Sequence, residues 1–399
     1  MADKADIALE LKPGKPLARK ILLVAGEESG DIYAGRICAH LLRMVGGLKI
    51  EGIGGPRMRA AGAHTFYDIS QMSSVGVASM LGRLRFFLGV LNELKAKIAE
   101  GEYDAVILID YPDFNMRIAK AADRGGLPVF YYVCPQFWAW RRYRLQAVKK
   151  YVDLMLVVFP FEEEFYTKRR INARFIGHPI LDELALKPAQ GRENFRENLG
   201  VDKGRILLGL LPGSRVGEVS RMLPLMLSAV KIIRAHKAVN LVIACADSID
   251  PDILARHIEE SGEEAVIVEN SSWEMMNACD YLICKSGTST LQALLANTPM
   301  QIVYRSDNFS YLLARSLTHV KWAGLPNLLA KREIVPELIQ WSMTPQNMAS
   351  AALRYLNSPE TGEKMRSELA RLAASLGESG ASARAAQSII NYLKKFQGL

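Results

Sequence analysis

The sequence predicts an α/β protein of two facing Rossmann-like domains, each with a parallel sheet, and a helical C-terminal segment. The chain has 399 residues, which is long for a single core. Short apolar runs alternate with helical segments, the pattern of βαβ units. The alternation occurs twice, on either side of a charged, proline-containing stretch at 187–203. We therefore place domains at 1–200 and 201–360, and expect the C-terminal helices of 361–399 to pack back on the first domain.

Composition restricts the class of protein. The formal net charge is +8 and the pI is about 9.1, which suits anionic partners such as phosphates, anionic lipid head groups or nucleic acid. Five cysteines without a CxxC pair and six scattered histidines predict neither disulfides nor a metal site. No apolar run has the length of a signal peptide or a membrane span. We expect a cytoplasmic protein whose membrane contact, if any, is peripheral.

Six buried strands are predicted in the first domain. They are 20–25, 49–53, 103–110, 129–133, 154–159 and 174–180, the last ending at a Gly-His-Pro turn. A turn at 26–31 leads into a helix at 32–44 and carries three acidic side chains, which would repel a phosphate. We expect this turn to bind sugar hydroxyls, and helix capping by Ser29 or Asp31 is the structural alternative.

The segment 73–98 is strongly apolar but contains arginines. It predicts an interfacial helix whose apolar side enters the head-group region while its cations meet lipid phosphates. A helix packed on the sheet, with arginines at its rim, is the alternative. The membrane-facing side chains would be Met80, Leu81, Arg83, Leu84, Arg85, Phe86 and Phe87.

Asp110 stands at the tip of the predicted strand 103–110. Ligands of open α/β sheets bind outside the carboxyl ends of the strands, so Asp110 is a candidate general base if an apolar wall raises its pKa. Helix capping by Asp110 or Asp113 is the alternative. An aromatic and cationic cluster at 134–144 follows the next strand, where an exposed Trp138 beside Arg141 could clamp a sugar and a phosphate, anchor an interface, or contact nucleic acid.

The second domain repeats the pattern. Its predicted strands are 206–211, 239–244, 265–268 and 281–284, with helices around 223–236 and 273–278. The stretch 281–300 predicts a strand, a small-residue turn and a helix N-terminus, which binds anions through unpaired amides. A purely structural strand, turn and helix would have the same pattern. The last hundred residues are predicted to be mostly helical.

Eight motifs, in order, resemble those of the bacterial lipid-A-disaccharide synthase family. They are Val24-Ala-Gly-Glu-Glu-Ser-Gly-Asp31, Leu81-Gly-Arg-Leu84, Ile109-Asp-Tyr-Pro-Asp-Phe-Asn115, Trp138-Ala-Trp-Arg141, Phe175-Ile-Gly-His178, Leu211-Pro-Gly-Ser-Arg215, Ser286-Gly-Thr-Ser-Thr-Leu291 and Leu325-Pro-Asn-Leu-Leu329. The resemblance implies a GT-B glycosyltransferase that joins UDP-2,3-diacylglucosamine to 2,3-diacylglucosamine-1-phosphate. It also implies a cytoplasmic enzyme, peripheral on the inner membrane with its anionic lipids, without a cofactor or a nucleic-acid partner, and homodimers with exchanged C-terminal segments.

The resemblance also implies site residues. Asp110 would be the base, and Arg215 with the amides after Ser286 would stabilise the departing diphosphate in place of a metal. Ser79 and Gln292 depart from the family pattern, because both stand where the family usually has Glu. The substrate-binding set would be Glu27, Ser29, Asp113, Asn115, Trp138, Arg141, His178, Ser214, Ser286, Gly287, Thr288, Thr290, Gln292 and Asn327.

Three alternatives to this function stay open at the sequence level. One is a diverged paralogue with another acyl-sugar acceptor. The second is a UDP-sugar epimerase, which has the same two-domain architecture but would leave the apolar segment 73–87 without a purpose. The third is a non-catalytic nucleotide-sugar-binding protein, suggested by the two departures from the family pattern. Release of UDP that depends on a diacylated acceptor would distinguish them.

Overall fold

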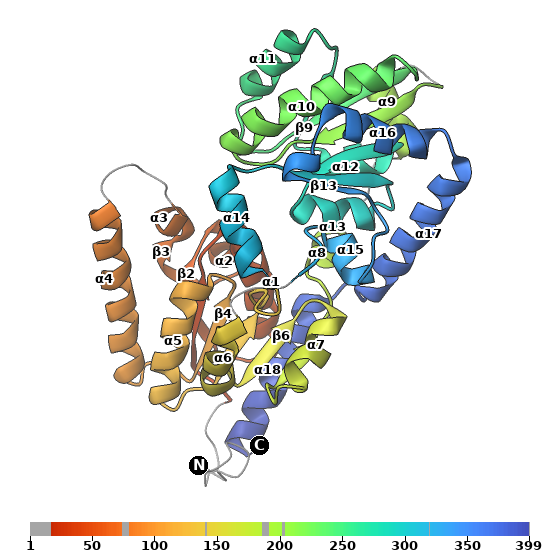
Figure 1. The fold of residues 1–399 in the computed structure, drawn as a ribbon. Helices are drawn as coiled ribbons and strands as arrows, with labels where there is room; N and C mark the ends of the chain where they lie inside the picture. The colour runs from red at the N-terminus through yellow and green to blue at the C-terminus, as the bar shows by residue number, and fades with distance from the viewer. Residues whose placement is uncertain are drawn as a thin grey trace. The chain divides into compact units, whose positions relative to one another are not determined.

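The computed structural model divides into two compact units (Figure 1). Unit 1 comprises Met1–Leu186 and Leu376–Leu399, and unit 2 comprises Lys187–Ser375. The structure describes residues 17–73, 80–139, 142–185, 191–201, 204–318 and 320–398. The boundaries expected at residues 200 and 360 both fall inside unit 2.

Unit 1 is built on a seven-stranded sheet with the order β3-β2-β1-β4-β5-β6-β7. All pairings between these strands are parallel. The strands are β1 (Lys20–Ala25), β2 (Lys49–Gly54), β3 (His64–Asp68), β4 (Ala105–Ile109), β5 (Val129–Tyr132), β6 (Leu154–Val157) and β7 (Ala173–Phe175).

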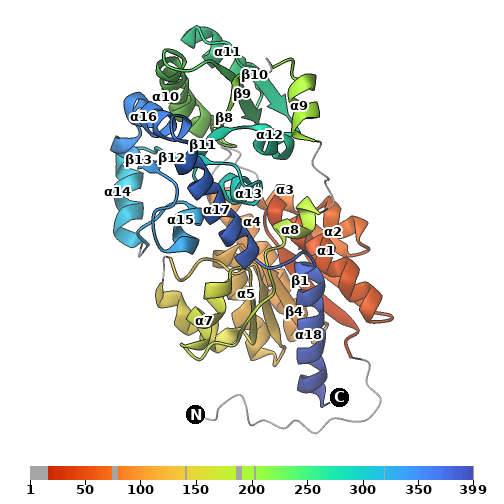
Figure 2. The same ribbon diagram turned by 90° about the vertical axis from the view of Figure 1, so that its right-hand side faces the viewer.

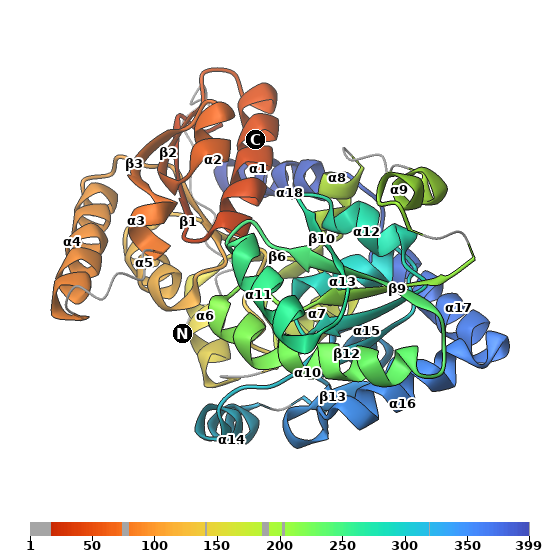
Figure 3. The same cartoon turned by 90° about the horizontal axis from the view of Figure 1, so that it is seen from above.

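Helices cover both faces of this sheet (Figure 3). The helices of unit 1 are α1 (Glu28–Met44), α2 (Pro56–Ala60), α3 (Ile69–Ser73), α4 (Met80–Ala99), α5 (Pro112–Arg124), α6 (Leu145–Tyr151), α7 (Pro160–Thr167), α8 (Ile180–Leu184) and α18 (Ala381–Gln397). A 3₁₀ turn, η1 (Arg142–Arg144), precedes α6.

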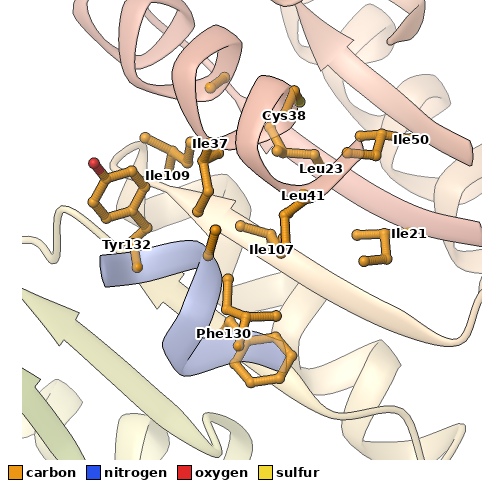
Figure 4. Packing of buried hydrophobic residues seen from close by; sticks show 14 of the residues in the cluster. Ile21, Leu23, Ile37, Cys38, Leu41, Ile50, Ile107, Ile109, Phe130 and Tyr132 are labelled. Carbon is orange, nitrogen blue, oxygen red and sulfur yellow. The ribbon is translucent and has the colours of Figure 1, made fainter. Parts of the chain in front are cut away.

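Alternation along the strands divides the core of unit 1 into two clusters, because successive side chains of a strand point to opposite faces. Ile21 and Leu23 of β1 pack with α1, while Leu22 and Val24 face α4 and α5. Figure 4 shows the first cluster, where side chains of β1, β4 and β5 meet those of α1. Both faces of every central strand are therefore apolar, as expected for a parallel sheet covered by helices.

The last helix, α18, belongs to this core. Its apolar side chains pack with those of α1, beside the sheet (Figure 2). The carboxylate of Asp182 accepts hydrogen bonds from the backbone N–H groups of Gly380, Ala381 and Ser382, at 2.5–3.0 Å. Unpaired amides at a helix start need such acceptors, so Asp182 fixes the point where α18 begins.

Unit 2 contains a six-stranded parallel sheet with the order β10-β9-β8-β11-β12-β13. Its strands are β8 (Ile206–Leu211), β9 (Val239–Cys245), β10 (Val266–Glu269), β11 (Tyr281–Lys285), β12 (Met300–Tyr304) and β13 (Glu337–Ile339). Its helices are α9 (Arg192–Asn198), α10 (Val216–Arg234), α11 (Pro251–Ser261), α12 (Ser272–Ala278), α13 (Thr288–Leu295), α14 (Asn308–Leu317), α15 (Leu325–Ala330), η2 (Gln340–Ser342), α16 (Pro345–Leu356) and α17 (Pro359–Ser375).

The two C-terminal helices pack on different units. Of the segment expected to return to the first domain, α18 packs on α1, whereas α17 contacts α13 and α16 of unit 2. The short strand predicted to end at a Gly-His-Pro turn is present: β7 ends at Phe175, and Gly177 follows with a left-handed φ of +84°. Helix α10 begins at Val216, earlier than predicted, and contains Pro224.

In each sheet, the order in which the chain adds strands reverses at one position. The chain adds β2 and β3 on one side of β1, then β4 to β7 on the other, and it does the same around β8 with β9 and β11. Loops after the two strands at such a switch point diverge and leave room for a ligand. The switch points are β1/β4 in unit 1 and β8/β11 in unit 2.

Candidate active site

The switch point of unit 1 brings two predicted site loops together. Ala25 of β1 pairs with Ile109 of β4, so the turn that begins at Gly26 and the segment that begins at Asp110 leave the same edge of the sheet. A Cβ atom on Gly26 would lie 2.4 Å from Cγ of Tyr111. The Tyr111 ring therefore occupies the space that any other residue at position 26 would need.

The backbone around Asp110 is held in an unusual conformation. Asp110 and Tyr111 both have left-handed φ angles, +45° and +48°. Each such residue costs on the order of 1–3 kcal/mol and persists only where its surroundings enforce it. The enforcing contacts are hydrogen bonds to the Asp110 carbonyl from Tyr131 Oη (2.6 Å) and Asn115 Nδ2 (2.8 Å).

The carboxyl group of Asp110 has a raised pKa, as a general base requires. Burial raises its pKa to about 6, and the nearby negative charge of Glu27 contributes, while the Tyr111 backbone N–H opposes the shift. At pH 7 the group is mostly ionised, and its proton affinity lies close to the working pH, where a general base is most effective. Strained backbone and a raised pKa at one residue are together typical of functional sites.

The other predicted residues of these loops have different environments. Glu27 and Ser29 are exposed at the start of α1. Asp113 is exposed and forms an ion pair with Arg144. Asn115 is fully buried. Its Nδ2 donates to the carbonyls of Ile109 and Asp110, which positions the loop, while its Oδ1 has no hydrogen-bond partner among the described residues. The carboxylate of Asp31 accepts three backbone N–H groups at 55–58 rather than capping α1.

In the aromatic cluster after β5, Trp138 is not exposed as the sequence predicts. Trp138 is only 5% exposed, and its Nε1 donates to Glu162 Oε1 at 2.8 Å. Glu162 also accepts the N–H groups of Val158 and Phe159, and burial raises its pKa to about 7. A buried carboxylate that needs donors explains why the indole points inward. Arg141 lies outside the described residues.

His178 is also buried, at 7% exposure. Its Nδ1 accepts the N–H of Ile180 at 3.2 Å, and its ring lies 5.3 Å from that of Phe159. Burial lowers the pKa of His178 to about 4, so the imidazole is neutral at pH 7 with its proton on Nε2. It can offer one hydrogen-bond donor to a substrate but no positive charge.

The switch point of unit 2 places the two predicted phosphate loops at one edge. Leu211 of β8 pairs with Cys284 of β11, so the turn at 212–215 and the turn at 286–287 start side by side. Gly213 has φ +124°, and a Cβ atom there would lie 2.7 Å from Glu218 Oε2. This position needs glycine for both its backbone angle and its close approach to α10.

Lys285 ends β11 at the same edge of the sheet and is not among the predicted site residues. Its Nζ lies 3.1 Å from Glu218 Oε1, and Arg215 approaches the same oxygen at 3.5 Å. Glu218 is in the first turn of α10, where the helix dipole favours a negative charge. The signal in the sequence was a cation at the tip of strand 281–284, directly before the small-residue turn. The hydrogen bond from Tyr131 to Asp110 could not be predicted from the sequence, because Tyr131 is one of several aromatic residues in the apolar strand β5.

The hydroxyl and amide residues of unit 2 divide into exposed and structural groups. Ser214, Arg215, Gly287 and Thr288 are exposed, and the last two begin α13, which has no side-chain cap. Ser286 Oγ donates to the Ala323 carbonyl, and Thr290 is buried with its hydroxyl bonded to the Gly287 carbonyl. These two hydroxyls shape the loop that leads into α13. The first amides of a helix lack intrahelical partners and can donate to an anion.

Two further predicted residues of unit 2 also differ. Gln292 is half-buried on α13. Asn327 is fully buried: its Oδ1 accepts the N–H groups of Ile334 and Val335, and its Nδ2 donates to Glu337. Both polar atoms of the Asn327 side chain therefore form hydrogen bonds inside unit 2 and hold the segment 334–337.

The predicted membrane-facing segment forms the first half of α4. The side chains of Met80, Leu81, Arg83 and Leu84 lie outside the described residues, as does Ser79. Arg85 is exposed. Phe86 and Phe87 are half-buried, with their rings 5.8 Å from Tyr67 and 6.4 Å from Tyr111 respectively. None of the helices in the described part of the chain combines the length and the apolar character needed to cross a bilayer.

Comparison with known structures supports the fold. The structure of UDP-GlcNAc 2-epimerase from Neisseria meningitidis bound to UDP-GlcNAc superimposes with a TM-score of 0.60, at 12% identity, covering 94% of this chain and 100% of that one. MurG from Acinetobacter baumannii gives a TM-score of 0.55 at 14% identity, covering 94% and 99%. At these identities the similarity shows the shared architecture alone, which is the predicted GT-B arrangement of two parallel-sheet domains.

Comparison with known sequences identifies the family. The family model described as lipid-A-disaccharide synthetase matches residues 21–390. The lipid-A-disaccharide synthases of Geobacter metallireducens and Myxococcus xanthus are 38% and 39% identical over 378 and 375 residues, which is 94% of this chain in both and 98% and 97% of those proteins. The chain therefore belongs to the lipid-A-disaccharide synthase family of glycosyltransferases.

Proposed function

We propose that the protein is an inverting glycosyltransferase that moves 2,3-diacylglucosamine from its UDP derivative to the 6-hydroxyl of 2,3-diacylglucosamine-1-phosphate. The products are the β-1,6-linked disaccharide-1-phosphate and UDP. The observation that carries this proposal is the family match across residues 21–390, at 38% identity to the Geobacter metallireducens synthase. The raised pKa and the constrained backbone of Asp110 support this residue as the base that such a transfer needs.

In the proposed reaction, Asp110 accepts the proton of the acceptor 6-hydroxyl as its oxygen attacks C1 of the donor sugar. The bond from C1 to the UDP oxygen breaks on the opposite face, which inverts the configuration. Negative charge then grows on the diphosphate. We assign its stabilisation to Arg215, Lys285 and the free amides at the start of α13, since preorganised donors aimed at developing charge lower the barrier most.

The proposed charge stabilisation comes from side chains and amides, so we expect turnover without an added metal. Activity should persist in EDTA, and loss of activity that Mg²⁺ restores would show that the diphosphate is bound through a cation.

We further propose that the enzyme acts at the cytoplasmic face of the inner membrane, with anionic lipids as partners and as a homodimer. The acylated substrates of the proposed reaction reside in a bilayer, and a net charge of +8 favours an anionic surface. Flotation with vesicles tests the first statement, and light scattering of the purified chain tests the second.

The test of function is an assay with UDP-2,3-diacylglucosamine and a panel of acceptors. We expect UDP release only with 2,3-diacylglucosamine-1-phosphate, and a product whose mass equals the disaccharide phosphate. UDP release with a different acyl-sugar, and none with this one, would identify a diverged paralogue. Donor isomerisation without UDP release would indicate an epimerase, and UDP binding without turnover a binding protein.

A further inference from the structure

A cationic groove lies on unit 1 next to the segment that begins at Asp110, and Asp113 of that segment is part of its lining. It is a cavity of about 770 Å³ between the second half of α4, α5 and the segment that leads into α6. In Figure 1, α5 lies between α4 and α6, and the contacts agree. We call it the α5 groove. The charged residues that line it are Lys95, Arg117, Lys120, Arg124, Arg144 and Asp113.

Most of the positive charge in the α5 groove is unneutralised. Asp113, the acidic residue of the lining, is paired with Arg144. Within the described ranges, the side chains of Lys95, Arg117, Lys120 and Arg124 have no salt bridge and no hydrogen bond. Cations held together without counterions repel one another, so the groove gains free energy when an anion enters.

The cations form a row with an apolar floor. Arg117, Lys120 and Arg124 stand at spacings of three and four residues, on one face of α5, and span about 10 Å at 1.5 Å per residue. Ile98 in the floor is 3% exposed, and Ala121 and Ala147 beside it are half-buried. A cationic row above an apolar floor suits a phosphate that carries hydrocarbon.

Two other anionic ligands fit the groove less well. The residues that line it include no aromatic side chain, so bases of a nucleic acid would have nothing to stack on. A free phosphate would contact only part of a row about 10 Å long and would leave the apolar floor uncovered. A surface of neighbouring phospholipid head groups would use both features.

We propose that the α5 groove binds the phosphate head groups of anionic phospholipids and so fixes the orientation of unit 1 on a bilayer. The inference rests on the peripheral membrane location proposed above and adds the site through which the surface is recognised. It differs from the first half of α4, because the groove is formed by the second half of that helix and by α5.

The test compares two variants with equal charge. Arg117→Gln/Lys120→Gln/Arg124→Gln removes three groove cations, and Lys49→Gln/Lys394→Gln/Lys395→Gln removes three exposed cations elsewhere on unit 1. Each lowers the net charge from +8 to +5, that is 8 − 3. With phosphatidylglycerol-containing vesicles, we expect the groove variant to bind at least about tenfold more weakly than the control, since each cation near such a surface contributes about fivefold.

Each further outcome decides the inference. If both variants bind vesicles equally weakly, net charge determines binding and the inference that the α5 groove is the binding site is wrong. If the groove variant binds vesicles as well as the unmutated chain does, the inference about the α5 groove is wrong, while the proposed membrane location is unaffected. If the unmutated chain binds no anionic vesicle, both the groove and the membrane location fail. Glycosyl transfer from detergent-dispersed substrates, measured in parallel, would still test the proposed function.

A second pair of variants covers the case in which the triple variant does not fold. Ala147→Glu places one carboxylate among the groove cations, and Ala147→Gln is its neutral control. We expect weakened vesicle binding with Glu alone. Titration of glycerol phosphate completes the test: saturable binding that the triple variant abolishes, together with unchanged vesicle binding, would mean that the groove takes a soluble phosphate instead.

Discussion

At the scale of single residues, the catalytic role proposed for Asp110 conflicts with stability. Its ionised side chain is largely buried, beside Glu27, which is why its pKa lies near 6. Asp110→Asn keeps the shape and removes both the proton acceptor and the buried charge. We expect turnover to fall by about 10²–10⁴, UDP binding to stay within twofold, and thermal stability at pH 7 to rise. Retention of more than half the rate would contradict the assignment.

The pH dependence of the same residue has a definite sign. A raised carboxyl pKa means that the folded state holds the proton more tightly, so ionisation between about pH 4 and 6 destabilises the fold and the loss is complete above pH 6. Catalysis requires the ionised form, so kcat/KM should fall as the pH drops through about 6. Asp110→Asn should flatten the stability profile over this interval, while Asp113→Asn, at an exposed position, should leave it in place.

The Lys285 and Glu218 pair gives a second test at this scale. Lys285→Gln leaves the Glu218 carboxylate with weaker compensation, and it removes a cation from the proposed diphosphate site. We expect lower stability, by about 1–2 kcal/mol, and weaker UDP binding. Lys285→Gln/Glu218→Gln should recover the stability but not the affinity for UDP. Recovery of both properties, measured by calorimetry, would show that Lys285 serves only to neutralise Glu218.

Gln292 tests the departure from the family pattern. If the glutamate usual in the family accepts hydrogen bonds from ribose hydroxyls, a glutamine retains one acceptor and turns the other contact into a donor. Gln292→Glu should therefore tighten UDP binding by less than about tenfold, the scale of one neutral hydrogen bond, and leave the acceptor KM unchanged. An unmutated chain without measurable UDP binding, rescued by Glu, would instead show that the donor site has been lost.

At the scale of elements, α4 combines a core side with an exposed side. Phe86 and Phe87 pack on Tyr67 and Tyr111, and Leu88 is 39% exposed. Phe86→Ser/Phe87→Ser should therefore destabilise unit 1 by about 2–4 kcal/mol, as expected for half-buried aromatic rings, whereas Leu88→Ser should lower vesicle binding without lowering Tm. If both variants have the same Tm as the unmutated chain, the two phenylalanines do not stabilise the core. The prediction that they face the membrane would then stand.

At the scale of the whole molecule, α18 completes unit 1 from the far end of the chain. Its three first amides are held by Asp182, whose pKa is lowered by these donors, although burial opposes the shift. Asp182→Ala should destabilise unit 1 by about 1–2 kcal/mol. A carboxyl group whose pKa is lower in the folded state stabilises the fold at pH values above its pKa in the unfolded chain. The stability difference between Asp182→Ala and the unmutated chain should therefore be largest at pH 7 and shrink below about pH 4.

Calorimetry of the two units separates this effect from a general loss of stability. The unfolding transition of unit 1 should move with Asp182→Ala while that of unit 2 stays, because the hydrogen bonds of Asp182 hold the start of α18, which belongs to unit 1. Movement of both transitions would show that the units unfold together.

The sequence by itself determined the fold class and the sheet edges where we propose the site. Unbroken apolar runs such as 206–211 can be buried on both faces only in a parallel sheet covered by helices, and Asp110 follows such a run directly. Short sequence motifs also identified the family. They could not predict that the side chains of Asn115, Trp138 and Asn327 are buried and hydrogen-bonded within the protein.

The tertiary structure decided those contacts, because burial and hydrogen-bond partners come from residues far apart in the chain. Trp138 turns inward to Glu162, which is 24 residues away, and α18 is capped by an aspartate about 200 residues earlier. The raised pKa of Asp110 and the row of unpaired cations on α5 have the same origin. Both depend on which surfaces fold against one another, and a sequence pattern records only neighbours along the chain.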